Sequence, residues 1–150
     1  MQKRIHPTTI KLLIAVLIFL GFGGIYGGIS FITDPTGGGM NVPQSYLYGL
    51  PINDYLLPGI VLLFGFGLFP LFLAYALWQK PKWLAPLANH YMGWIITVML
   101  GIGLVTWMVL QIGIMGIQQP IQVVIIVIAI TILILTFLPD TRSYYADDNR

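Results

Sequence analysis

The feature that most constrains this chain is a set of four long apolar runs that contain no charged residue. They cover residues 12–32, 56–78, 91–112 and 121–138. A run of about 18 or more apolar residues is long enough to cross the hydrocarbon core of a bilayer as a helix. Hydrocarbon offers no partner for a free backbone amide, so membrane-crossing runs of this kind form helices. The sequence therefore predicts an all-α, four-helix transmembrane bundle with up-down-up-down topology.

Composition supports the same class of protein. Hydrophobic residues make up 57% of the 150 residues and charged residues 8%, whereas about 25% of the residues of an average soluble domain are charged. The net charge of +2 gives no reason to expect a nucleic-acid partner, and the absence of cysteine excludes disulfides and thiol redox chemistry. The first run is longer than the core of a signal peptide, so we expect a span there and one transmembrane domain over residues 1–150.

The basic residues predict how the bundle is oriented. The connections 33–55 and 111–120 contain neither lysine nor arginine. All seven basic residues lie at the opposite ends of the spans: Lys3, Arg4, Lys11, Lys80, Lys82, Arg142 and Arg150. By the positive-inside rule, both termini and the tail 139–150 are expected in the cytoplasm, and the long loop 33–55 outside. The expected location is the cytoplasmic (inner) membrane of a bacterium.

The central part of every span lacks ionisable side chains, and this absence narrows the function. Proton-coupled antiporters need an embedded carboxylate, voltage sensors need arginines, and retinal proteins need a lysine. The spans also offer no nucleophile paired with a base, so we do not expect an enzyme. Membrane lipid and other transmembrane helices are the expected partners.

Glycine pairs recur near the middle of three spans. Glycine lets two helix backbones approach closely, which is the usual way for helices to pack in membranes. Helix packing is therefore the favoured role of these residues, namely Gly21, Gly23, Gly24, Gly27, Gly28, Gly65, Gly67, Gly101 and Gly103. A midplane cavity or hinge is the alternative, because Pro70 removes the donor for the carbonyl of Phe66.

Polar residues gather at the predicted outer side. Asp34 and Asp54 are the only charged residues of the loop 33–55, and Gln111 lies at a comparable depth. Together they could form a shallow ligand-binding site for a cation or a polar head group. In the alternative interpretation, Asp34 makes a local turn with Pro35 and Asp54 caps the second helix.

Two histidines lie near the predicted cytoplasmic surface. His6 precedes the first span, and His90 precedes the third. Either could in principle ligate haem or a chlorophyll-type pigment. A solvated histidine at the membrane surface is the alternative, and nothing else in the sequence predicts a cofactor or a metal site.

Several short motifs resemble a group of uncharacterised small four-span bacterial membrane proteins. They are the turn Asp34-Pro35-Thr36-Gly37-Gly38, the helix start Asp54-Tyr55-Leu56-x-Pro58-Gly59, the pair Trp107-x-x-x-Gln111, and Gln118-Gln119-Pro120. In that group an acid often occupies the position of Gln111. The resemblance implies a topology and a motif cluster at the outer face, but no activity.

The sequence therefore leaves more than one function open. The leading hypothesis is a non-enzymatic interaction protein, either an accessory or structural subunit of a larger membrane assembly or a homo-oligomer. The alternative is a binder or facilitator of a lipid, a quinone or another lipophilic small molecule at the extracytoplasmic side. An intramembrane enzyme is the weakest hypothesis.

Overall fold

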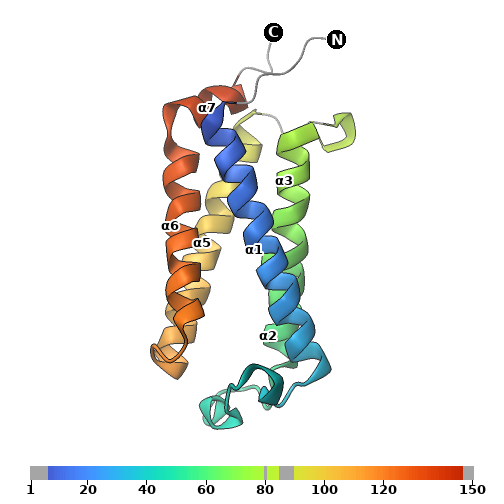
Figure 1. The fold of residues 1–150 in the computed structure, drawn as a ribbon, viewed down its shortest axis with the longest axis vertical. Coiled ribbons are helices and arrows are strands. Elements are labelled where there is room, and N and C mark those ends of the chain that lie inside the picture. The colour runs from blue at the N-terminus through green and yellow to red at the C-terminus, as the bar shows by residue number, and fades with distance from the viewer. Residues whose placement is uncertain (1–6, 80, 85–89, 147–150) are drawn as a thin grey trace.

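The chain folds into an all-α bundle, as the sequence predicts (Figure 1). The computed structural model describes residues 7–79, 81–84 and 90–146. Four of its helical segments are long and apolar enough to cross a membrane: Thr8–Thr33, Leu56–Gln79, Met92–Met115 and Pro120–Phe137. Each coincides with one of the predicted spans and differs from it by a few residues at the ends. Residues 34–55 lie together at one end of the bundle, which we call the loop end (Figure 1).

The second span is not one regular α-helix. It consists of α2 (Leu56–Val61), a π-helical segment η3 (Leu62–Leu68) and α3 (Phe69–Gln79). Pro70 has no N–H, so it cannot donate the α-helical hydrogen bond to the carbonyl of Phe66. Gly65 and Gly67 stabilise the α-helical conformation less than alanine would, because glycine loses more conformational entropy on folding. The wider π-helical turns therefore occur where the missing hydrogen-bond donor of Pro70 and the two glycines coincide.

Helix α1 (Thr8–Thr33) is the central element of the bundle. It runs diagonally, from α6 at the far end to α2 at the loop end, and packs against both (Figure 1). Near the loop end its contact with η3 is made by glycines. A methyl group at Gly24 would collide with the carbonyl of Phe66, and one at Gly28 would lie 2.6 Å from the amide nitrogen of Leu63. These glycines therefore let α1 lean closely against the second span.

The predicted packing glycines differ in what they contact. Methyl groups at Gly21, Gly67 and Gly101 would also meet neighbouring atoms within 3 Å, and one at Gly27 would make an ordinary contact of 3.6 Å with Leu62. In contrast, Gly23 and Gly103 have no heavy atom of the described chain near their Cβ position, and Gly65 has only Val61 of its own span, at 4.0 Å.

The second half of the chain forms a hairpin that is closed by a short helix. Helix α5 (His90–Met115) packs against α6 (Pro120–Phe137). The side chain of Gln122 accepts hydrogen bonds from the backbone N–H groups of Gln118 and Gln119 at 3.0 and 3.1 Å, which caps α6. Residues 139–146, expected within a tail, instead form α7 (Pro139–Ala146), which packs against α1, α5 and α6.

Candidate functional site

The loop end is held in place by Tyr55, which precedes α2. Its hydroxyl donates to the carbonyl of Pro43 at 2.8 Å, and its backbone N–H donates to the carbonyl of Pro35 at 2.8 Å. Its ring stacks on Phe31 of α1 with centroids 5.0 Å apart, and only 1% of the residue is exposed. Tyr55 thus ties the start of α2 to the first half of the loop and to the end of α1.

The two acidic residues of the loop make local hydrogen bonds. Asp34 accepts from the backbone N–H and hydroxyl of Thr36, at 3.2 and 2.5 Å, and from the N–H of Gly39 at 2.8 Å. These bonds, that of the Thr36 hydroxyl first, lower the pKa of Asp34 below its ordinary value. Asp54 accepts from the N–H of Leu56 at 3.0 Å, at the start of α2. Both carboxylates therefore serve the turn and the helix start.

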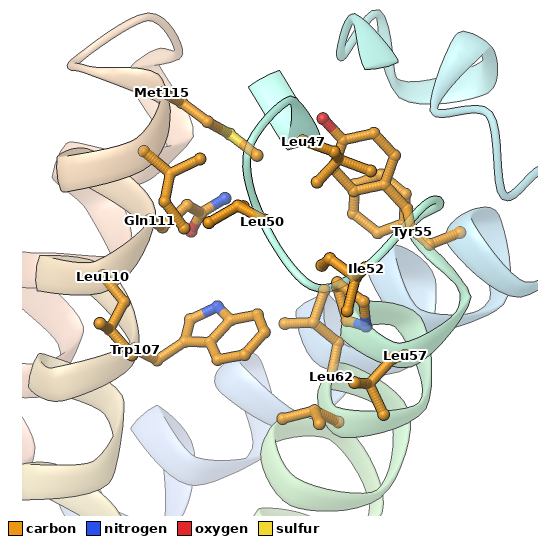
Figure 2. A pocket seen from close by; sticks show the side chains of 14 residues that line it. Leu47, Leu50, Ile52, Tyr55, Leu57, Leu62, Trp107, Leu110, Gln111 and Met115 are labelled. Atoms are coloured by element: carbon orange, nitrogen blue, oxygen red, sulfur yellow. The ribbon is translucent and has the colours of Figure 1, made fainter. Parts of the chain in front are cut away.

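A cavity of about 240 Å³ lies between α5 and the first two spans at the loop end. We call it the loop-end cavity. Figure 2 shows Trp107, Leu110, Gln111 and Met115 of α5 on one side, and Leu57, Leu62 and Tyr55 on the other. Leu47, Leu50 and Ile52 of the loop also line it. Its deep end adjoins the contact between Phe66 of η3 and Trp107, whose ring centroids are 5.9 Å apart.

The cavity is related to the tilt of α1 toward the second span. The glycine contacts draw α1 and the second span together near the loop end, while α5 stays with α6 and α7. The space between α5 and the first two spans is filled only partly by side chains of the loop. Neither Pro70 nor any glycine lines this cavity, so the alternative of a midplane cavity or hinge at the glycine pairs stays a prediction.

The walls of the cavity are apolar except at two side chains of α5. Trp107 and Gln111 are four residues apart, so they lie on the same face of the helix. Both point toward the cavity in Figure 2, with the indole nitrogen and the amide group directed inward. Neither the indole N–H nor the amide has a hydrogen-bond partner within the described part of the chain, whereas the other polar lining side chain, Tyr55, is bonded.

The ligand site proposed from the sequence does not coincide with the loop-end cavity and stays a prediction. Gln111 lines the loop-end cavity, but Asp34 and Asp54 do not. Sequence reasoning did not select Trp107 as a site residue, although its spacing from Gln111 was a usable signal. His6 lies outside the described residues, and His90 begins α5 but its side chain lies outside the described part. Haem or pigment ligation by these histidines stays a prediction.

Comparison with protein-family models, with curated proteins and with solved structures finds no match to this chain. The resemblance to small four-span bacterial proteins therefore stays a prediction.

Proposed function

We propose that this multi-pass membrane protein is a non-enzymatic binder of a lipophilic small molecule, which it holds in the loop-end cavity. The observation that carries the proposal is an apolar cavity lined by two hydrogen-bonding groups without partners in the described chain. Small-molecule sites in proteins typically combine apolar walls with a few polar groups that orient the ligand. A lipid, a quinone or a related lipophile meets this description.

The location of the site follows from the distribution of charge. All seven basic residues lie before the first span, between the second and third spans, or after the fourth span. These positions are at the ends of the spans opposite to the loop 33–55. The positive-inside rule then puts both termini in the cytoplasm and the loop-end cavity on the extracytoplasmic side of a bacterial inner membrane. The ligand would accordingly be held in the outer leaflet.

Filling the cavity tests the proposal. Leu50→Trp adds bulk to a side chain that lines it, and Tyr48→Trp is the matched control, since Tyr48 lies in the same loop, is 84% exposed and does not line it. We expect native mass spectra of the purified protein to show a bound lipophile in the wild type and in Y48W, and not in L50W. Equal lipophile content in a folded L50W protein would refute the proposal.

A specific observation also favours the interaction hypothesis. The space at the Cβ positions of Gly23 and Gly103 is open in the described chain, although a glycine inside a helix costs about 1 kcal/mol relative to alanine. A second transmembrane helix packed on these positions would explain them. Native mass measurement tests this second candidate: Gly23→Leu and Gly103→Leu should weaken an oligomer or complex. A wild-type protein that is monomeric and without a partner in gentle detergent would argue against it.

A further inference from the structure

The volume of the loop-end cavity limits what can occupy it. An apolar cavity of about 150 Å³ holds one benzene molecule, so the volume of about 240 Å³ admits a group only somewhat larger than benzene. That is enough for a small head group and a few attached carbons. A membrane lipophile with a long chain must therefore leave most of that chain outside the cavity.

The rim of the cavity shows where such a chain can leave. Four side chains both line the cavity and reach the molecular surface: Leu57 and Val61 of α2, 56% and 36% exposed, and Leu110 and Ile114 of α5, 58% and 41% exposed. All four belong to membrane-spanning segments. With these segments placed across a bilayer, the opening between the four side chains borders lipid, and we call it the α2–α5 opening.

The polar groups specify the head group. The indole N–H of Trp107 is a donor only, and the amide of Gln111 has two donor hydrogens and an acceptor oxygen. None of the lining residues is charged. An uncharged group that accepts hydrogen bonds, such as a carbonyl oxygen, satisfies these donors, whereas a carboxylate or ammonium would enter an apolar cavity without a counter-ion.

The positions of Gln111 and Trp107 along α5 also favour an uncharged hydrogen-bond acceptor as the head group. Gln111 lies four residues before Met115, the end of α5, and Trp107 lies eight residues before it. At 1.5 Å per residue these positions are about 6 and 12 Å from the helix end. Unpaired donors at the deeper position are costly in hydrocarbon. A ligand that satisfies them gains affinity over one that cannot.

We propose that the ligand is an uncharged long-chain lipophile with a carbonyl head group, which enters sideways from the outer leaflet through the α2–α5 opening. The carbonyl accepts hydrogen bonds from Trp107 and Gln111, and the chain extends between Leu57 and Leu110 into the bilayer. This inference rests on the proposed function, because it names the class of ligand that the same cavity takes and the route to it.

Two matched probes test the head group. Undecyl methyl ketone and tridecane have similar length, but only the ketone carries a carbonyl. We expect the wild-type protein in nanodiscs to bind the ketone about tenfold more tightly than the alkane, as measured by native mass spectrometry. Gln111→Met and Trp107→Phe should reduce this preference severalfold. Gln118→Met, on an exposed residue outside the cavity, should retain it.

Two matched variants test the route. Leu110→Trp places a bulky side chain at the α2–α5 opening, and Val109→Trp makes a comparable change at the neighbouring residue, which is 65% exposed and does not line the cavity. Nanodisc-embedded protein is mixed with ketone-loaded vesicles, and bound ketone is counted after increasing times. We expect a severalfold longer half-time of uptake for L110W, and a wild-type half-time for V109W.

The outcomes separate this inference from the proposed function. If neither probe binds and no lipophile co-purifies, the proposed function fails and the inference fails with it. If ketone and alkane bind equally in the wild type, the cavity binds lipophiles but the carbonyl assignment is wrong. If the ketone is preferred but L110W and V109W take it up at the same rate, the sideways route is wrong.

Discussion

At the scale of single residues, the contact of Gly24 with Phe66 sets how closely α1 approaches the second span. We predict that Gly24→Ala destabilises the protein by about 1–3 kcal/mol, because the added methyl collides with the carbonyl of Phe66 and the two helix backbones must separate to admit it. Gly113→Ala is the control, because no neighbouring heavy atom of the described chain lies within 4 Å of its Cβ position, and it should be neutral or slightly stabilising. Thermal unfolding in one detergent measures both, and equal effects would contradict the assignment.

Asp34 gives a prediction that depends on pH. Its hydrogen bonds lower its pKa below the ordinary 3.8, so the charged form stabilises the folded loop above that pH, and the stabilisation is lost as pH falls through the lower folded value. The Gly39 amide proton, which donates to Asp34, should therefore titrate in NMR spectra with a midpoint below 3.8. Asp34→Asn should abolish that titration. A wild-type midpoint at or above the ordinary value would refute this account.

Some residue roles could be predicted from the sequence and others could not. The turn at Asp34 and the helix start at Asp54 follow local rules that need only neighbouring residues, and the structure shows both sets of bonds. Which glycine contacts a helix could not be predicted, because these spans are apolar on every side and carry no marked face. Gly23 and Gly24 look equivalent in sequence and differ only once α1 has a neighbour.

At the scale of elements, α7 shows how a short polar segment completes an apolar bundle. The hydroxyl of Tyr145 forms a hydrogen bond 2.9 Å long with the hydroxyl of Thr97 on α5, and burial raises the pKa of the phenol. The hydroxyl of Tyr144 donates to the carbonyl of Leu77 near the end of α3, at 2.9 Å. The sequence predicts this segment as part of the tail 139–150, and Pro139 followed by Asp140 is a local helix-start signal.

These contacts predict that α7 contributes to stability. Tyr145→Phe should cost about 1 kcal/mol through the lost hydrogen bond, and Tyr145→Ala about 3–5 kcal/mol through the emptied space, as for other large aromatic residues. Tyr48→Phe is the control, because Tyr48 is 84% exposed in the loop. Thermal unfolding provides the measurement. If Y145A unfolds at the wild-type temperature, α7 does not stabilise the bundle.

The second span shows a limit of sequence reasoning at this scale. Its length and apolar character predict a helix, and Pro70 predicts a weak point near Phe66. The π-helical form over Leu62–Leu68 does not follow from these signals alone. The segment packs closely against α1, whose residues lie about forty positions earlier in the chain, and such a contact cannot be deduced from local sequence.

At the scale of the whole molecule, orientation in the membrane decides which leaflet the loop-end cavity faces. The chain has no cysteine, so single introduced cysteines report their own position without interference. We predict that Tyr48→Cys reacts with a membrane-impermeant maleimide on intact cells, and that Ser143→Cys on α7 reacts only after permeabilisation. The opposite pattern would place the cavity in the cytoplasmic leaflet.

The arrangement of the bundle as a whole was predictable, but the cavity was not. Four apolar runs of sufficient length leave few other folds for a chain of this size. The cavity depends on the tilt of α1 and on the side chains left between separated helices, and neither quantity is encoded in the length of a span. The sequence offered Gln111 as a candidate, yet its neighbour in the cavity is Trp107 rather than an acid.

The tilt of α1 determines which residues of such a protein can be substituted during evolution without loss of the fold. The close glycine contacts lie at Gly21, Gly24, Gly28 and Gly67, while none of these residues lines the cavity. Exchanges at Leu50 or Met115 can therefore alter the shape of the space without disturbing the paired backbones. The shape of the cavity can thus change by single substitutions while the helix contacts stay the same.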